Sequence, residues 1–145
     1  MNPQPVTQFR VTVPNLPGEL AKVTRLLVKA KVNITGMMTE SFGEVAHIRL
    51  LAAPEKGVGS LLEDAGFDVM DVPVYLVDLS NKPGHLDKLA KELAEERINI
   101  LAVYGTGLGD KARLVIAVDE IEKAGPIITQ WAEAQTRSRP HEVKH

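Results

Sequence analysis

The six residues at 15–20, Asn-Leu-Pro-Gly-Glu-Leu, return at residues 81–86 as Asn-Lys-Pro-Gly-His-Leu. The offset from proline to proline is 83 − 17 = 66, and it also relates Asn-Ile at 33–34 to Asn-Ile at 99–100. It persists without a gap as far as Gly59 and Gly125. A single Asn-x-Pro-Gly segment is weak evidence for a duplication, because these residues are common in turns of all proteins. A fixed offset kept over most of the chain indicates an internal duplication.

Hydrophobic periodicity predicts the elements of each copy. Phe9, Val11 and Val13 alternate with polar residues, as in a half-buried strand. Pro-Gly then opens a helix with an apolar stripe at Leu20, Val23, Leu27 and Ala30, which is Leu86, Leu89 and Leu93 in the second copy. The rest of the first copy is predicted as a strand from Asn33, a turn at Phe42-Gly43, a strand through residues 46–50, a helix over 58–65 that Gly66 ends, and a strand at 67–72.

The second copy is predicted to end differently. Its last helix continues through Ile127, Ile128 and Trp131 without a Gly-Phe stop, so no fourth strand is expected. Pro73 is interpreted as the break between the last strand of one copy and the first strand of the next. We therefore expect one unit at residues 1–72, a second at 73–136 and a mobile polar tail at 137–145.

The element order β-α-β-β-α-β predicts an α+β fold of tandem ferredoxin-like units, with antiparallel sheets and helices on one face. The uncovered face of the second copy is predicted to be apolar, carrying Leu76, Leu101, Val103 and Val115. An exposed apolar face needs a cover, so we expect a subunit or inter-unit contact there. The matching face of the first copy is predicted to be polar, with Arg10, Thr12, Thr35, Met37, His47 and Arg49.

Composition excludes several classes of protein. The 145 residues carry 17 basic and 19 acidic side chains, and this balance argues against a nucleic-acid-binding surface. The absence of cysteine excludes disulfides and thiolate chemistry. No apolar run approaches the length of a membrane span, and the N-terminus lacks the features of a secretory signal. A cytoplasmic protein that contacts neither membrane nor nucleic acid is expected.

At its two Asn-x-Pro-Gly loops and its two Asn-Ile strand starts, the chain resembles the ACT domain family, and within it the small proteins of two tandem ACT units. The resemblance covers roughly residues 8–131 and departs at the missing last strand. It implies a homodimer that binds a free amino acid between paired units, where the strand-to-helix loop of one unit faces the second strand of its neighbour. It implies no cofactor, no metal and no catalysis. The site residues that it implies are Asn15, Leu16, Pro17, Gly18, Asn33 and Met38 in the first copy, with Asn81, Lys82, Pro83, Gly84, His85, Asn99 and Tyr104 in the second.

The physical chemistry of the loops is compatible with this role. The first N–H groups of a helix lack intrahelical partners and lie at the positive end of its dipole, so they suit a carboxylate. Glycine at 18 and 84 permits close approach to the backbone, and an asparagine side chain both donates and accepts. The same residues would also be needed merely to shape a tight turn. Because Lys82 and His85 replace Leu16 and Glu19, the second loop is predicted to be the better carboxylate site.

Other functions are less well supported. The glycines at 105, 107 and 109 lie between predicted strands, so they indicate a hairpin and not a dinucleotide loop. The predicted third strands carry no aromatic residue for RNA stacking, and the loop at residues 14–18 has no arginine for an acylphosphatase-like phosphate site. No nucleophile–base pair and no paired histidine ligands are readable, which argues against an enzyme or a metal site. A ligand-free module that pairs with a metabolic enzyme is the remaining alternative to an amino-acid sensor.

Overall fold

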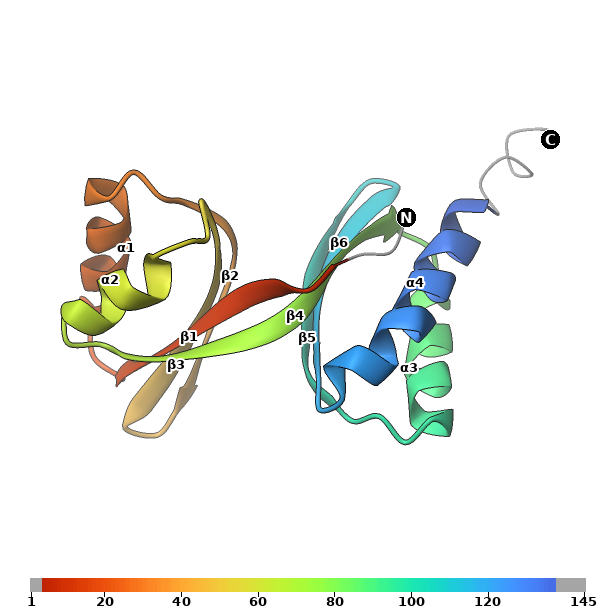
Figure 1. Cartoon of the computed structure of the whole chain (residues 1–145). Helices are drawn as coiled ribbons and strands as arrows, with labels where there is room; N and C mark the ends of the chain where they lie inside the picture. The colour runs from red at the N-terminus through yellow and green to blue at the C-terminus, as the bar shows by residue number, and fades with distance from the viewer. Residues whose placement is uncertain (1–3, 138–145) are drawn as a thin grey trace. The chain divides into compact units, whose positions relative to one another are not determined.

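A computed structural model describes residues 4–137, and these form two compact units (Figure 1). The N-terminal unit is Thr7–Val72. The C-terminal unit contains the described residues from Pro73 onward together with residues 4–6.

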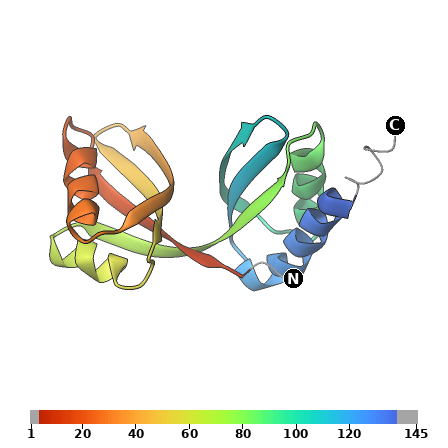
Figure 2. The ribbon, with the colours of Figure 1, turned by 90° about the horizontal axis from the view of Figure 1, so that it is seen from above.

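The N-terminal unit has the predicted ferredoxin-like order. Its elements are β1 (Val6–Pro14), α1 (Glu19–Lys29), β2 (Asn33–Phe42), β3 (Val45–Ala53), α2 (Val58–Asp64) and the start of β4 (Asp68–Ser80). The strands follow the order β2-β3-β1-β4, and β3 pairs antiparallel with both β1 and β2. Both helices lie on one face of this sheet (Figure 2). The fold class predicted from the element order is therefore confirmed.

The C-terminal unit repeats this arrangement with two differences. Its elements are the second part of β4, α3 (His85–Glu95), β5 (Ile100–Leu108), β6 (Lys111–Val118) and α4 (Ile121–Arg137), with strand order β4-β6-β5. The prediction that Pro73 separates two strands is wrong, because β4 continues through it. Proline removes one N–H donor but is compatible with extended backbone. As predicted, α4 is long and no strand follows it within the described residues; residues 138–145 of the predicted tail lie outside them.

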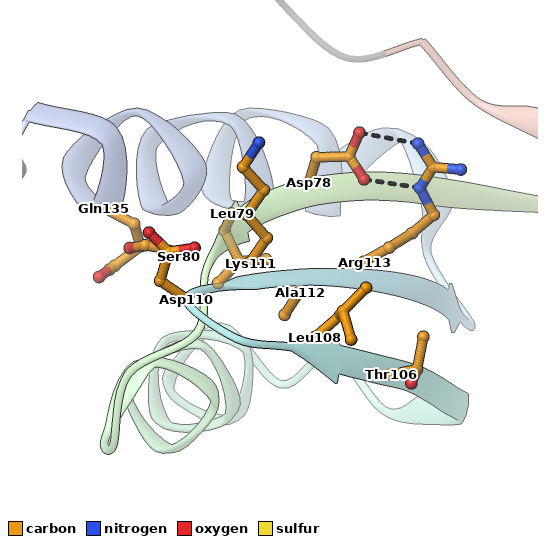
Figure 3. Close-up of a pocket in the computed structure, with 10 residues that line it drawn as sticks. All are labelled: Asp78, Leu79, Ser80, Thr106, Leu108, Asp110, Lys111, Ala112, Arg113 and Gln135. Carbon is orange, nitrogen blue, oxygen red and sulfur yellow. Dashed lines mark hydrogen bonds and ion pairs between the residues drawn. The ribbon is translucent and has the colours of Figure 1, made fainter.

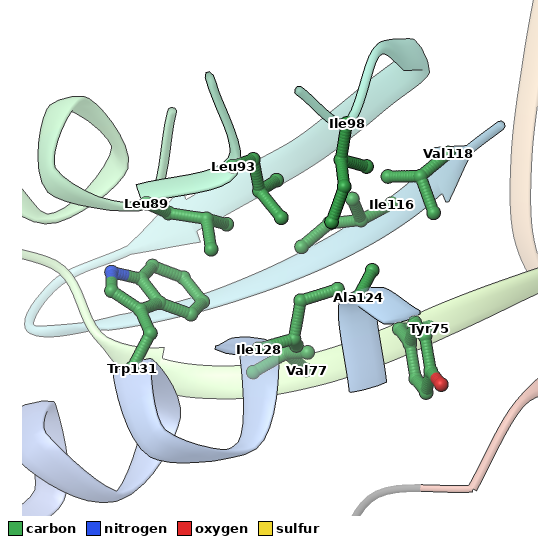
Figure 4. Packing of buried hydrophobic residues seen from close by; sticks show 10 residues of the cluster. All are labelled: Tyr75, Val77, Leu89, Leu93, Ile98, Ile116, Val118, Ala124, Ile128 and Trp131. Carbon is green, nitrogen blue, oxygen red and sulfur yellow. The ribbon is translucent and has the colours of Figure 1, made fainter. Parts of the chain in front are cut away.

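Each unit buries its own apolar core between helices and sheet. On α1, Val23 and Leu27 are buried, whereas Leu20 and Ala30 at the ends of the predicted stripe are exposed. The buried core of the N-terminal unit is Phe9, Val11, Val13, Val23, Leu27, Ile48, Leu50, Val58 and Leu62. The buried core of the C-terminal unit is Tyr75, Val77, Leu89, Leu93, Ile98, Ile116, Val118, Ala124, Ile128 and Trp131 (Figure 4).

Trp131 fills the space between α3 and α4 in the C-terminal unit. The residue is 1% exposed, and its indole N–H donates to the backbone carbonyl of His85 at 2.7 Å. Figure 4 shows its ring beside Leu89 and close to Ile128. The matching residue of the first unit is the exposed Ala65, so the longer last helix of the second unit has a bulky anchor of its own.

The backbone geometry of the two units repeats with the sequence. Positive φ angles recur at Gly18 and Gly84 (89° and 88°), at Gly43 and Gly109 (63° and 65°), and at Lys31 and Arg97 (59° and 58°). Left-handed backbone is uncommon for residues other than glycine. Its recurrence in a lysine and an arginine shows that the turn after α1 and the turn after α3 have the same conformation.

A β-bulge in each second strand changes the predicted faces. The register shifts between Ile34 and Gly36, and again between Ile100 and Ala102. Beyond the bulges, Met37 pairs with Leu50 and Val103 pairs with Ile116, and both partners are core residues on the helix-covered side. The prediction that Met37 and Val103 belong to the uncovered faces is therefore wrong. A bulge inserts one residue, which reverses the alternation of every residue that follows.

Candidate functional site

The two strand-to-helix loops have the geometry that the sequence predicts. Gly18 and Gly84 are the N-caps of α1 and α3, both in left-handed conformation, and neither helix has a side-chain cap. The helix-start N–H groups are thus not used by a capping side chain, and the helix dipole adds positive potential there. A Cβ added to either glycine would meet nothing within 4 Å, so a positive φ is what requires glycine at these positions.

The two loop asparagines both bind the hairpin turn of their own unit. Asn15 donates from Nδ2 to the carbonyl of Gly43 at 3.0 Å, and Asn81 donates to the carbonyl of Gly109 at 3.4 Å. This supports the turn-shaping interpretation of the asparagine. It does not exclude binding, because the side-chain oxygen of neither residue accepts a hydrogen bond from any residue in the described range 4–137.

The residues that differ between the loops are held differently. Glu19 pairs with Lys22 at 2.7 Å, and its side chain is only 13% exposed. Nδ1 of His85 forms a hydrogen bond with the backbone carbonyl of Ser80 at 2.9 Å. Because a carbonyl only accepts, Nδ1 is the donor and carries the proton. Its second nitrogen, Nε2, remains as the polar atom for other partners. Lys82 is half-buried beside it.

A hollow of about 170 Å³ borders the first loop. Asn15, Leu16 and Glu19 line it together with the ends of β1, β2 and β3. Two carboxylates, those of Glu19 and Glu40, line this hollow. Although Lys22 pairs with Glu19, this lining suits a cation or an ammonium group better than a carboxylate. The hollow includes two of the predicted site residues, Asn15 and Leu16.

Asn33 and Asn99 lie away from the loops of their own units. Asn33 pairs with Ala53 at the start of β2, whereas the loop lies near the hairpin turn after Phe42. Nine strand steps of about 3.3 Å separate those ends by roughly 30 Å. Asn99 is tied to Asp119, whose carboxylate accepts its backbone N–H at 3.0 Å. A site that combined a loop with either asparagine would therefore need residues from two units.

Met38 and Tyr104 occupy equivalent places on the uncovered faces. Met38 pairs with Arg49, and Tyr104 pairs with Val115. Directly opposed residues project from the same face, and Arg49 and Val115 alternate with core residues. Both side chains are half-buried.

A larger cavity, about 600 Å³, lies in the C-terminal unit next to the second loop, and sequence reasoning missed it. It is lined by Asp78, Leu79, Ser80, Thr106, Leu108, Asp110, Lys111, Ala112, Arg113 and Gln135 (Figure 3). None of these is a predicted site residue. The cavity adjoins the loop through Ser80, which precedes Asn81, and through Asp110, whose carbonyl accepts the Asn81 N–H at 2.7 Å.

A two-point ion pair forms one wall of this cavity. Arg113 donates from Nε and Nη2 to the two carboxylate oxygens of Asp78, at 2.7 and 3.1 Å (Figure 3). These hydrogen bonds hold the pKa of Asp78 below its usual value, although partial burial opposes the shift. Both side chains are more than half exposed, so we expect the pair to stabilise the fold by only a few tenths of a kcal/mol. The repeat offset of 66 residues is the feature of the sequence that could have indicated this pair. The matching positions in the first unit are Thr12 and His47, which share a hydrogen bond of 3.0 Å.

No group of three or more His, Asp or Glu side chains among residues 4–137 is arranged to hold a metal ion. No helix in the same range has both the length and the apolarity needed to cross a membrane.

Comparison with known families now decides the relationship that the loops suggested. Residues 4–134 match the family of ACT domain pairs. The chain belongs to this family. The predicted resemblance is confirmed, and the two units described above are ACT units. A search among curated proteins returned no match.

Several solved structures share this fold over most of the chain. Protein BT0572 from Bacteroides thetaiotaomicron is similar with a TM-score of 0.81 and 22% identity, over 90% of each chain. The ligand-free regulatory subunit of aspartate kinase from Thermus thermophilus is similar with a TM-score of 0.66 and 14% identity, over 89% of this chain and 91% of that one. The corresponding subunit from Thermus flavus is similar with a TM-score of 0.64 and 13% identity, over 93% of this chain and 94% of that one. At such identities the likeness shows the fold alone.

Proposed function

We propose that this ACT pair is a non-catalytic sensor of a free amino acid in the cytoplasm. The observation that carries the proposal is the duplicated loop, in which a left-handed glycine, an uncapped helix start and an anchored asparagine recur in both units. A helix start supplies donors for an α-carboxylate, and an asparagine oxygen is an acceptor for an α-ammonium group. The regulatory ACT fold and the similarity to regulatory subunits support the same class of function.

We further propose that the two loops are not equivalent and that the second binds the carboxylate more strongly. Lys82→Ala should weaken amino-acid binding about fivefold to tenfold, or roughly 1–1.4 kcal/mol, because a cation is lost beside the helix start. Leu16→Ala, the matched change in the first loop, should alter the affinity less than twofold. Isothermal titration calorimetry of both variants measures this difference.

A glycine pair supplies the matched control for that experiment. Gly18 and Gly84 have nearly the same φ, and an added Cβ has free space at both. Valine therefore imposes the same backbone strain at either position, and only the difference between the variants reports on the ligand. Gly84→Val should cost more affinity than Gly18→Val. An equal or larger loss from the two changes in the first loop would show that the acidic hollow at Glu19 is the principal site.

We also propose a homodimer. Leu101 and Val103 on β5 are 57% and 38% exposed. Val115, another member of the predicted apolar set, is already buried within the chain, with only 4% of its surface exposed. Val103 lies on the helix-covered side and Leu101 lies in the bulge, but both side chains are exposed on the edge strand, and exposed apolar side chains there favour association. Light scattering at micromolar concentration should give about twice the chain mass of 15.8 kDa. A monomer of wild-type protein, or a dimer that persists unchanged in Leu101→Lys/Val103→Lys, would contradict the proposal.

A regulatory subunit that pairs with a metabolic enzyme is the second candidate. The observation that favours it is the similarity to regulatory subunits of aspartate kinase, which this chain matches over 91–94% of their length. The two candidates differ in their need for a ligand: a sensor binds an amino acid by itself, whereas a pure pairing module does not.

A further inference from the structure

Two arginines lie opposite each other on the uncovered sheet face of the N-terminal unit. Arg10 on β1 is the Cα partner of Arg49 on β3, and we call these two residues the arginine pair. Each one alternates with core residues of its own strand, such as Val11 and Leu50, so both side chains project away from the helices. Like charges in directly opposite positions destabilise a sheet. The arginine pair therefore needs a compensating negative charge.

Few donors of the arginine pair are used. Each guanidinium group carries five N–H donors. Within residues 4–137, the only hydrogen bond of either group runs from Nη2 of Arg10 to the sulfur of Met70, a weak acceptor, at 3.4 Å. The Nε atoms of both arginines are buried and have no hydrogen-bond partner. An unpaired buried donor is costly, so the arrangement indicates an acceptor that this unit does not supply.

One carboxylate compensates the arginine pair in part. Oε1 of Glu40 on β2 lies 4.0 Å from Nε of Arg49, which is too far for a hydrogen bond. No other carboxylate in the described part of the chain lies within ion-pair distance of either arginine. Two guanidinium groups and one carboxylate leave a formal excess of one positive charge (2 − 1 = 1). The Arg49 side chain is only 14% exposed, so water compensates this charge poorly.

The C-terminal unit shows that the fold itself does not require charge at these positions. The offset of 66 places Leu76 and Val115 where the first unit has Arg10 and Arg49, and the two apolar residues are again Cα partners. Val115 is buried. The arginine pair is thus a feature of the N-terminal unit alone, and a common structural need of both units does not explain it.

The geometry of the arginine pair favours a tetrahedral oxyanion over a carboxylate. A guanidinium group presents parallel N–H donors in a rigid fork, and one fork already satisfies both oxygens of a carboxylate. A phosphoryl group has further oxygens and can accept from two forks at once. Directly opposed residues of adjacent strands have Cβ atoms roughly 5 Å apart, so both forks can reach one such group.

We infer that the arginine pair is a binding site for the phosphoryl group of a small soluble compound, on the uncovered sheet face of the N-terminal unit. Met38, the partner of Arg49 on β2, and Met70 beside Arg10 supply apolar contacts for the rest of that compound. The inference goes beyond the proposed function, because it concerns a second ligand of different chemistry and uses neither of the strand-to-helix loops.

Isothermal calorimetry of the full chain with inorganic phosphate, at fixed ionic strength, tests the site. The wild-type protein should bind with a Kd of about 1 mM or tighter. Arg10→Gln and Arg49→Gln should each weaken binding about tenfold or more, because charged hydrogen bonds are lost. Arg10→Lys and Arg49→Lys keep the charge but lose the fork, so each should weaken binding about threefold or more. Arg25→Gln changes an exposed arginine of α1 and should leave the affinity unchanged.

A double variant provides an independent control. Arg10→Leu/Arg49→Val introduces the apolar pair of the second unit, so it should fold and bind no phosphate. Melting temperatures without phosphate check the folding of every variant. If the double variant does not fold, the glutamine and lysine variants still decide the result, because they keep a long polar side chain at each position.

Acetate and succinate, titrated in the same way, test the choice of anion. Both should bind at least about tenfold more weakly than phosphate. Succinate that binds as tightly as phosphate overturns the phosphoryl assignment. Phosphate binding that the arginine variants leave unchanged would lie elsewhere, for example at a helix start, and would overturn the inference. Absence of binding to the wild type up to about 10 mM phosphate would do the same. These results do not depend on amino-acid binding, so the proposed sensor function stands or fails separately.

Discussion

Trp131→Ala should destabilise the protein by about 3–5 kcal/mol, the largest loss that we expect from any single change. The indole ring is 1% exposed and lies in the core of the C-terminal unit, so its removal leaves a large cavity among Leu89, Ile128 and their neighbours. The carbonyl of His85 also loses its donor. Chemical denaturation followed by far-UV circular dichroism measures the change in free energy of unfolding.

Two further variants separate the causes. Trp131→Phe keeps most of the ring and lacks the N–H, so it should cost about 1–3 kcal/mol. Gln130→Ala, an exposed neighbour on the same helix, should change stability by less than about 0.5 kcal/mol. A loss below about 1 kcal/mol for Trp131→Ala would mean that α4 does not contribute to the core as described.

Gly105→Ala should cost about 2–3 kcal/mol, the second largest effect. A Cβ at this position would overlap the backbone carbonyl of Arg113 and the side chain of Leu114 on the adjacent strand. The leucine can rotate, but the carbonyl belongs to β6 and cannot move without disturbing the sheet, so overpacking strains β5. Thermal unfolding should show a fall in Tm of several degrees.

The neighbouring positions provide the comparison for that variant. The side chain of Thr106 is exposed, so Thr106→Ala should change the stability by less than about 1 kcal/mol. Gly107→Ala would bring a Cβ to 2.5 Å from Nδ2 of Asn81, the end of a movable side chain. It should cost less than Gly105→Ala and loosen the loop. If Gly105→Ala were as stable as the wild type, the close approach of β5 and β6 would be contradicted.

The fold could be read from the sequence because the duplication doubles every signal. A turn such as Phe42-Gly43 is weak alone, but its counterpart at Leu108-Gly109 carries the same left-handed glycine. The hairpin prediction for the glycines at 105–109 is confirmed for the same reason, since β5 ends at Leu108 and β6 begins at Lys111. The bulges after Ile34 and Ile100 were not readable. A bulge changes the register with a partner strand, and single-strand periodicity contains no information about the partner.

The candidate site could be predicted only in part. The glycines and asparagines of the loops follow from local turn chemistry, and in the structure they shape the turn before each helix. The cavity residues Ser80 and Lys111 come from strands that are 31 residues apart in sequence (111 − 80 = 31), and only the β4–β6 register brings them together. The offset offered one clue, because Asp78 and Arg113 replace the polar pair Thr12 and His47.

The central claim is that the chain binds a free amino acid, and a thermal-shift screen of the twenty amino acids tests it most directly. A ligand that binds only the folded chain stabilises it by about 2.7 kcal/mol at 100 times its Kd, which raises the Tm by several degrees. We expect one amino acid, or a small chemically related group, to give such a shift, with the others at the level of the buffer. No shift with any amino acid at 10 mM, from a protein that unfolds cooperatively, would contradict the sensor function and favour a ligand-free pairing module.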